Sequence, residues 1–274
     1  MAQDPRITLL EQTNAGVAAA RNHGIQIAEG TFVAPIDADD LWKPTKIERQ
    51  VERFLASDNK LALVYTGVAL IDEESRTIQV TKHPPNFEGR ILDRLIEGNF
   101  VTCGSAPLMR KDYVLDVGGY DPKLRARNAQ GCEDWKLSLR LAERYEFATV
   151  QDFLVGYRQS SGMMSRNFQA MKRSHDLVLD DVRRRHPEAP EENFQRSATL
   201  YTIWLVNRNI SALKLLWPAL RNDRNCLMSP TVMKRLLWIP VRHLYLFIIL
   251  WLPGLGLKLE ELSGKDCKPF LDSE

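Results

Sequence analysis

A short acidic string near the N-terminus has the clearest chemical potential in the sequence. Asp37, Asp39 and Asp40 follow directly after an apolar run at residues 31–36. Neighbouring carboxylates raise one another's pKa unless a cation compensates their charge. Mg²⁺ and Mn²⁺ prefer oxygen ligands, and Mg²⁺ often takes only one or two carboxylates beside water and substrate phosphates. The string predicts a metal site on Asp39 and Asp40, but by itself it is weak evidence, because solvated surface loops also contain such strings.

The elements around this string predict where it lies in the fold. Asn14 is a typical N-cap residue, and Gly30 is placed to end the helix that follows it. Residues 31–36 read as a short buried strand whose carboxyl end carries the aspartates. Pro44 is typical of a helix start, and apolar residues then repeat at helical spacing, at Ile47, Val51 and Phe54. The acidic string is therefore predicted in a loop between a strand and a helix.

Strand and helix patterns alternate through residue 157. The predicted strands are 61–66, a hairpin of 68–71 with 78–80, 106–109, 147–150 and 153–157, and the predicted helices are 111–117 and 133–145. This alternation predicts an α/β sandwich with a mostly parallel sheet. After about Arg166 the composition changes to charged helical segments and then to apolar ones. We therefore expect a catalytic domain at residues 1–166 and a helical C-terminal region at residues 167–274.

The composition of the chain limits which partners, metals and cellular locations we expect for it. The chain has 274 residues with 44% apolar content, enough to bury a full core. Its 37 basic and 35 acidic residues give a net charge of +2, which offers no general attraction to nucleic acid. The four cysteines lack the spacing of a zinc site, and the N-terminus lacks the pattern of a signal peptide. These features favour reduced thiols and a cytoplasmic location.

The C-terminal apolar run predicts contact with a membrane surface. The run LYLFIILWLPGLGLKL is shorter than the roughly 20 apolar residues of a spanning helix, and Pro240 and Pro253 interrupt its surroundings. Lys234, Arg235 and Arg242 flank it with positive charge. We expect a peripheral element at the inner face of the cytoplasmic membrane. A buried helical hairpin is the alternative.

Four stretches of sequence resemble the family-2 glycosyltransferases of the GT-A fold. The first is NAGVAAARNHGIQIAEGTFVAPIDADDLWKP, which contains the acidic string. The others are LMRKDYVLDVGGYD, GCEDWKLSLRLAERYEF and FLVGYRQSSGMMSRN. The resemblance implies inverting transfer of a sugar from a nucleoside-diphosphate sugar to an acceptor hydroxyl, with Mg²⁺ or Mn²⁺ as cofactor. The acceptor would be a sugar or a lipid-linked molecule of cell-envelope polysaccharide or glycolipid synthesis.

The resemblance also implies roles for individual residues. Asp134, in the Glu-Asp-Trp segment, matches the catalytic base, although a carboxylate at a helix start can also simply stabilise the helix. The diphosphate and the nucleotide would be contacted by residues of the acidic string and by two arginines: Asp37, Asp39, Arg21 and Arg158. Arg21 could instead brace Asp37, and Arg158 could instead form a structural ion pair. Many relatives carry a histidine two positions after the second arginine, where this chain has Ser160, so the resemblance supports no metal ligand from that loop.

Part of the family pattern is missing. The resemblance runs from Asp4 to about Asn167, and members normally begin with a further βαβ unit before this point. The expected fold is therefore an N-terminally incomplete GT-A sandwich. A catalytically impaired sugar-nucleotide-binding or scaffold protein is the first alternative. A nucleotidyltransferase is the second, but it should show a Gly-rich phosphate loop near its start, and the sequence has none there.

Overall fold

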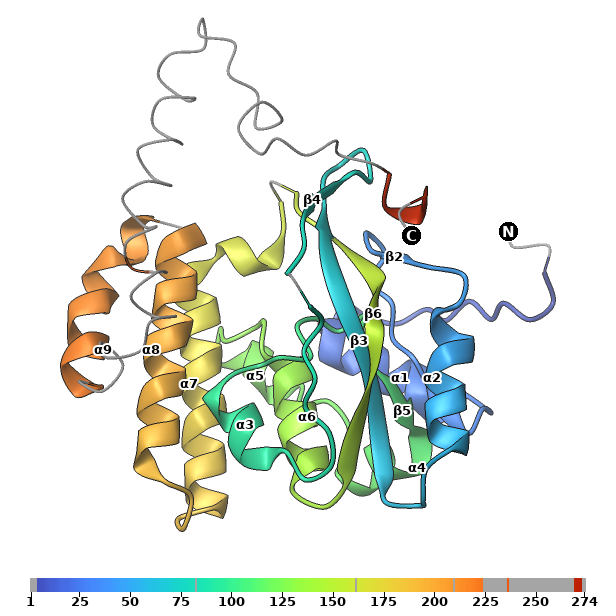
Figure 1. Cartoon of the computed structure of the whole chain (residues 1–274), viewed down its shortest axis with the longest axis horizontal. Helices are drawn as coiled ribbons and strands as arrows, with labels where there is room; N and C mark the ends of the chain where they lie inside the picture. The colour runs from blue at the N-terminus through green and yellow to red at the C-terminus, as the bar shows by residue number, and fades with distance from the viewer. Residues whose placement is uncertain are drawn as a thin grey trace, which may run out of the picture.

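A twisted mixed sheet forms the centre of the molecule. The computed structural model describes residues 4–81, 83–160, 162–208, 210–223, 236 and 269–272. Within these residues the sheet has six strands in the order β1-β5-β3-β6-β2, with β4 paired to β3 (Figure 1). The strands are β1 Phe32–Val33, β2 Leu41–Trp42, β3 Leu61–Ile71, β4 Thr77–Gln79, β5 Leu108–Arg110 and β6 Glu146–Arg158.

Two long strands, β3 and β6, lie side by side and in parallel at the centre of this sheet. All the other strand pairs of the described residues are antiparallel. The register of β3 against β6 shifts on both sides of Gly67. A Cβ at this position would lie 2.8 Å from the carbonyl oxygen of Asp152, so the close approach of the two backbones requires glycine. The expectation of a mostly parallel sheet was therefore wrong, because short antiparallel strands flank the one parallel pair.

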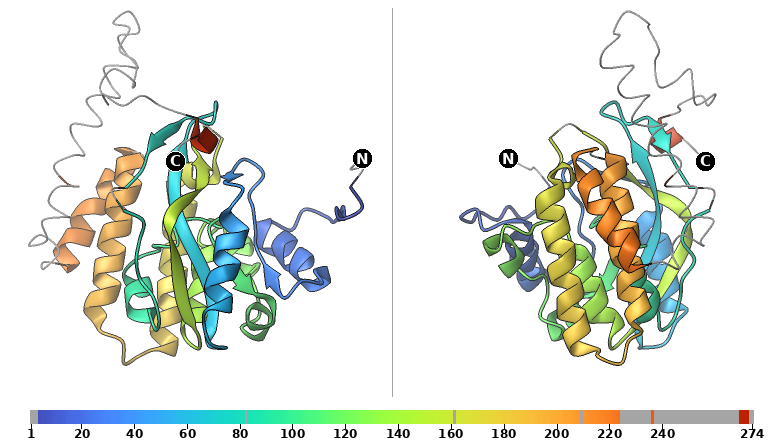
Figure 2. Two further views of the ribbon diagram at one scale, coloured as in Figure 1. Left: turned by 45° about the vertical axis from the view of Figure 1, so that its right-hand side comes forward. Right: turned by 90° about the vertical axis from the view of Figure 1, so that its left-hand side faces the viewer.

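Helices cover both faces of the sheet. They are α1 Val17–Ile27, α2 Lys46–Leu55, α3 Leu92–Glu97, α4 Lys111–Asp116, α5 Lys123–Ala126 and α6 Glu133–Ala142. Phe54 of α2 packs in one cluster with Val64 of β3, whereas Leu63 and Tyr65 of β3 belong to the larger core that contains α6. Figure 2 shows α2 and α6 on opposite sides of the strands. The α/β class predicted from the sequence is confirmed.

A helical region follows the sheet, as the sequence predicted. The elements after residue 160 are η1 Met164–Arg166, α7 Phe168–Arg185, α8 Glu191–Arg208, η2 Ile210–Leu215, α9 Leu216–Asn222 and η5 Phe270–Asp272. The side chain of Asn167 caps α7 by accepting a hydrogen bond from the Ala170 amide over 3.1 Å. Helix α8 packs against both α7 and α3, so this region is joined to the sheet domain (Figures 1 and 2).

The structure differs in detail from several of the elements predicted from the sequence. The first helix begins after Gly16, and the side chain of Asn14 accepts hydrogen bonds from the Gly16 amide and from Arg125, so Asn14 is not the N-cap. The predicted strand at 31–36 contains only Phe32–Val33 as strand. In α2 the buried positions are Lys46, Gln50 and Phe54, and Ile47 is exposed. The two strands predicted at 61–71 are one strand, and so are the two at 147–157.

The predicted membrane-surface element lies outside the described residues, apart from Leu236. Among the helices that the structure does describe, none is long and apolar enough to cross a membrane.

Candidate functional site

The acidic string forms a tight turn between β1 and β2. The amide of Asp40 donates to the carbonyl of Asp37 over 3.0 Å, which closes the turn. The amide of Asp37 donates to the hydroxyl of Ser105 over 3.0 Å, and the indole of Trp42 donates to the Ser105 carbonyl over 2.9 Å. Ser105 is fully buried. This residue, which the sequence did not single out, therefore holds both ends of the acidic turn.

The three carboxylates of the turn have different surroundings. Asp40 is only 5% exposed, and its Oδ1 accepts a hydrogen bond from the Arg158 amide over 3.0 Å. Its Oδ2 is buried without a hydrogen-bond partner in the described structure. Burial raises the pKa of Asp40 to about 6, although the nearby Ser105 hydroxyl and the Arg158 amide lower it. Asp39 is exposed, whereas Asp37 is partly buried and forms an ion pair with Arg21.

These carboxylates fit a divalent cation that is shared with a substrate. Within the described residues no three or more His, Cys, Asp or Glu side chains come together as a ready-made metal site. Asp40 nevertheless offers a buried oxygen that has no hydrogen-bond partner in the described part of the chain, and the carboxylate of the adjacent Asp39 is exposed. Mg²⁺ is commonly held by one or two carboxylates and substrate phosphates rather than by a complete protein cage. Asp39 and Asp40 are thus the residues that could hold the metal.

Arg158 connects the acidic turn to the loop after β3. Its Nε donates to the Asp39 carbonyl over 2.7 Å, and its Nη1 donates to the carbonyls of Asp72 and Glu73 over 2.6 and 2.9 Å. Its Nη2 donates to the Ser75 hydroxyl over 3.0 Å. The guanidinium therefore bridges two loops through oxygen atoms of the protein. Its predicted contact with a diphosphate stays a prediction, since these donors already have partners in this structure.

Arg21 lies between the acidic turn and the predicted base. It projects from α1, pairs with Asp37 and lies 5.3 Å from the ring centroid of Tyr120. Burial alone lowers the pKa of Arg21, but Tyr120, Asp37 and Asp134 together raise it. A Cβ on Gly104 would lie 2.7 Å from Nη2, so the absence of a side chain there makes room for the guanidinium. The brace to Asp37 is thus present, and diphosphate contact by Arg21 stays a prediction.

Asp134 lies in the first turn of α6, where the sequence predicted it. Its Oδ1 accepts a hydrogen bond from the Trp135 amide over 2.7 Å. The residue is only partly exposed to solvent. Protein atoms packed around the carboxyl group remove water from it, and this burial raises its pKa to about 6. Arg21 lowers that pKa, and the neighbouring Glu133 raises it. A carboxylate with this pKa is mostly ionised at pH 7 and is a stronger base than an ordinary aspartate.

The residues proposed from the sequence form two connected groups. Asp37, Arg21 and Asp134 interact electrostatically, and Asp39 and Asp40 are both bound by Arg158. Sequence reasoning missed Ser105 and also a buried pair in α2, Lys46 and Gln50. The spacing of that pair by one helical turn was visible, but charged and amide side chains at such positions are usually exposed.

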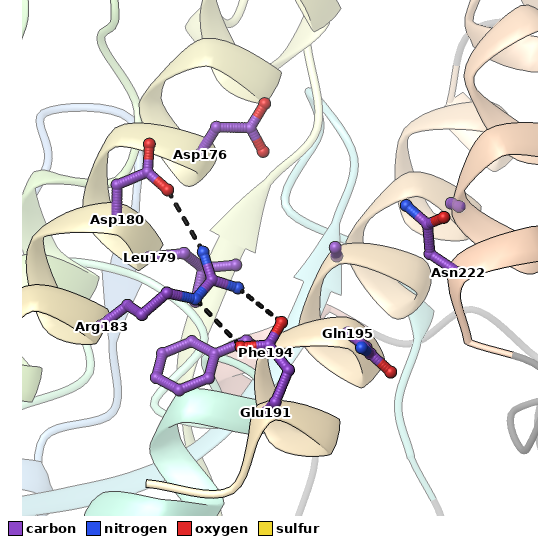
Figure 3. Close-up of a pocket in the computed structure, with 10 residues that line it drawn as sticks. Asp176, Leu179, Asp180, Arg183, Glu191, Phe194, Gln195 and Asn222 are labelled. Carbon is purple, nitrogen blue, oxygen red and sulfur yellow. Dashed lines mark hydrogen bonds and ion pairs between the residues drawn. The ribbon is translucent and has the colours of Figure 1, made fainter. Parts of the chain in front are cut away.

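A separate pocket of about 480 Å³ lies among α7, α8 and α9 (Figure 3). Arg183 crosses it and pairs with Asp180 and Glu191, as the dashed lines in Figure 3 show. Its lining residues are Asp176, Leu179, Asp180, Arg183, Glu191, Phe194, Gln195, Ala198, Ala219 and Asn222. None of the predicted site residues lines this pocket, so it is distinct from the candidate functional site.

Comparison with known proteins identifies the family. The chain belongs to the family described as Glycosyltransferase like family 2, which matches residues 5–188. The resemblance found in the sequence is therefore confirmed at the level of the family.

Two curated relatives illustrate this relationship. MJ1057 of Methanocaldococcus jannaschii, an uncharacterized glycosyltransferase, is 27% identical over 158 residues, or 57% of this chain and 52% of that protein. TuaG of Bacillus subtilis, a putative teichuronic acid biosynthesis glycosyltransferase, is 27% identical over 181 residues, or 66% of this chain and 67% of that protein. The match thus spans about half of the first protein and two thirds of the second.

Among solved structures, the mannosyltransferase PcManGT of Pyrobaculum calidifontis, in complex with GDP-Man and Mn²⁺, is similar with a TM-score of 0.47 and 16% identity. The alignment covers 94% of this chain and 70% of that one.

Proposed function

We propose that this chain transfers a sugar from a nucleoside-diphosphate sugar to an acceptor hydroxyl, with inversion at the anomeric carbon. The observation that carries the proposal is the position of Arg21, which interacts with both Asp37 of the acidic turn and Asp134 at the start of α6. This arrangement supports a shared site for the candidate metal-binding turn and the candidate base in a member of a glycosyltransferase family.

Asp134 would act as the general base. A sugar hydroxyl is a poor nucleophile at neutral pH, and Asp134 takes its proton while the hydroxyl oxygen bonds to the anomeric carbon. The bond from that carbon to the diphosphate oxygen breaks on the opposite face, and the nucleoside diphosphate leaves with the electron pair. Burial supports this role, because it raises the pKa of the carboxyl towards the pH at which the reaction would run.

Asp39 and Asp40 would bind the donor's diphosphate through a divalent cation. When bound, Mg²⁺ or Mn²⁺ offsets the charge that develops on the leaving diphosphate. Arg21 would add positive charge beside the same turn, and Asp37 would keep it oriented. The buried Oδ2 of Asp40, which has no hydrogen-bond partner among the described residues, supports the assignment.

The proposal is tested by incubating the whole chain with a panel of nucleoside-diphosphate sugars and Mn²⁺. Release of nucleoside diphosphate is measured first without an acceptor and then with oligosaccharide or lipid-linked acceptors. We expect one donor to be consumed and NMR of the product to show the inverted anomer. Asp134→Asn should slow the transfer by about 10²-fold to 10⁴-fold. Donor binding without turnover in every mixture would instead favour a sugar-nucleotide-binding protein that does not catalyse transfer.

We also propose peripheral contact with a membrane through residues 234–258, which would suit a lipid-linked acceptor of the cell envelope. Support comes from the sequence alone, through the basic residues Lys234, Arg235 and Arg242 beside an interrupted apolar run. The chain should sediment with vesicles that contain an anionic lipid, and a variant that ends at Ser229 should not. Equal sedimentation of the two proteins would contradict membrane contact by this segment.

A further inference from the structure

The turn that carries Asp134 is packed against the C-terminal helices. Gly131 has a φ of +117°, and a Cβ there would lie 2.0 Å from Sδ of Met171 in α7. Even a methyl group at residue 131 would therefore collide with α7. The chain approaches this helix three residues before the candidate base.

The hydroxyl group of Tyr201 in α8 contacts both α7 and the start of α6. The hydroxyl of Tyr201 donates to the Met171 carbonyl over 3.3 Å and lies 3.6 Å from Sγ of Cys132, the N-cap residue of α6. Cys132 is buried. Burial also raises the pKa of the Tyr201 hydroxyl, which therefore keeps its proton. A single phenol thus connects the first turn of α6 to α7 and α8.

Stacked rings continue the same connection. Trp135, next to Asp134 in α6, stacks on His175 of α7 with ring centroids 5.0 Å apart. His175 stacks in turn on Tyr201 at 4.0 Å, with the ring planes 14° apart. Burial lowers the pKa of His175, and its Nε2 lies 3.2 Å from the Ser197 hydroxyl. The rings therefore form a close-packed, uncharged column between α6 and α8.

We propose that Tyr201 is a positioning residue for Asp134, because its hydroxyl and its ring hold residues 131–135 against α7 and α8. The kinetic part of this inference rests on the proposed function. Catalytic groups lose efficiency when they are displaced by even about 1 Å, and a rigid supporting shell prevents such displacement. The helical region would thus contribute to turnover without contributing a group to the reaction.

The matched test compares Tyr201→Phe with Tyr145→Phe. Both changes remove only a hydroxyl group from a stacked tyrosine. Tyr145 stacks on Tyr113 at 4.0 Å and donates to Asp116 over 2.9 Å, in a part of the chain that carries none of the candidate site residues. We expect Tyr201→Phe to lower kcat on the order of 10-fold to 10²-fold while donor KM changes by less than about 2-fold. Tyr145→Phe should leave both constants unchanged.

The pH profile separates positioning from a general loss of folded protein. If the turn loosens, water reaches Asp134, and the acidic limb of the kcat profile should move to lower pH in Tyr201→Phe only. The ionisable groups that act on Asp134 or respond to it come from every neighbouring segment: Arg21, Asp37, Cys103, Tyr120, Cys132, Glu133 and Tyr201. Of these groups, only Tyr201 is altered in the variant.

Thiol labelling tests the same contact without any activity. Burial raises the pKa of the Cys132 thiol to about 12, so N-ethylmaleimide should react slowly with it in the wild type. Tyr201→Phe should speed this labelling by more than about 3-fold, as read from the Cys132 peptide by mass spectrometry. The buried Cys103 serves as the internal control and should not change.

The outcomes separate this inference from the proposed function. Equal labelling of Cys132 in the wild type and in Tyr201→Phe overturns the inference, whether or not the wild type transfers sugar. Faster labelling together with normal kcat and an unmoved pH profile also overturns it, because the turn would then be loose without effect on Asp134. A wild type that transfers no sugar, combined with faster labelling in Tyr201→Phe, would support the contact and count against the proposed function.

Discussion

The backbone amide of Arg158 donates a hydrogen bond over 3.0 Å to Oδ1 of Asp40, which lies 118 residues earlier in the chain. The bond fixes one oxygen of the carboxylate and leaves Oδ2 without a partner in the described structure. Because the donor is a backbone group, the bond does not depend on the side chain at position 158. Strand β6 therefore orients a candidate metal ligand through its backbone alone.

Asp40→Ala should reduce donor binding and turnover together. The change removes the buried carboxylate that we assign to the metal, so the diphosphate would lose its link to the protein. Donor affinity measured by calorimetry and kcat measured at several Mn²⁺ concentrations should both fall, and excess Mn²⁺ should restore part of each. Asp93→Ala, which alters an exposed aspartate in α3, is the control and should behave like the wild type.

Chelation tests the metal assignment without a mutation. EDTA should abolish transfer, and Mn²⁺ or Mg²⁺ added in excess of the chelator should restore it. Full transfer in excess EDTA would contradict the role given to Asp39 and Asp40.

Lys46 should make the free energy of unfolding vary with pH in the alkaline range. It is fully buried, its Nζ donates to Gln50 over 2.8 Å, and it lies 4.0 Å from the ring centroid of Trp42. Burial lowers the pKa of Lys46 from 10.5 to about 7. Between these values the unfolded chain holds a proton that the folded chain has released, so the free energy of unfolding should rise with pH, by up to about 1.4 kcal/mol per pH unit.

Urea unfolding between pH 7 and pH 9.5 measures this slope. Lys46→Met should remove the contribution of this residue, because methionine fills a similar volume without a titrating group. Lys60→Met alters an exposed lysine and should keep the wild-type slope. The same slope in all three proteins would show that Lys46 keeps its proton in the folded state.

Local patterns in the sequence predicted the parts of the site that depend on neighbouring residues. Asp40 follows a short strand and Asp134 begins a helix, as expected, because each position depends on the apolar spacing of a few residues nearby. The contacts of Arg158 with Asp39 and Asp40 could not be predicted this way. They join segments far apart in the chain, and an arginine has the same local pattern whether it binds a diphosphate or a backbone carbonyl.

The fold was predicted in its class but not in its strand directions. Alternating strands and helices usually indicate parallel pairing, and β3 and β6 follow that rule. Strands as short as β1 and β2 pair antiparallel through only two residues each, and so few residues give no directional signal in the sequence. The burial of Lys46 was hidden for a related reason, because its partner Gln50 is itself held by the carbonyls of Val64 and Ala106, which are distant in the sequence.

The pH dependence of turnover should have an acidic limb near pH 6. Asp134 must be ionised to accept a proton, and burial raises its pKa to about 6, so the active fraction should fall as the pH drops through that value. Asp40 has a similar pKa, and saturating Mn²⁺ should lower it by stabilising the ionised form. A limb that stays near pH 6 at saturating metal therefore reports Asp134, and a limb near pH 4 would contradict its burial.

Asp134→Asn should separate catalysis from binding. The amide keeps the size of the side chain and the acidic turn is unchanged, so donor affinity should stay within about 2-fold of the wild type. Turnover should fall by about 10²-fold to 10⁴-fold, because the amide cannot take the proton of the acceptor hydroxyl. Glu133→Gln is the matched control, since Glu133 is the adjacent carboxylate and accepts a hydrogen bond from the Gly131 amide over 2.9 Å. If Glu133→Gln lost turnover while Asp134→Asn kept it, the base would be Glu133, and the carboxylate of Asp134 would serve only to stabilise the start of α6.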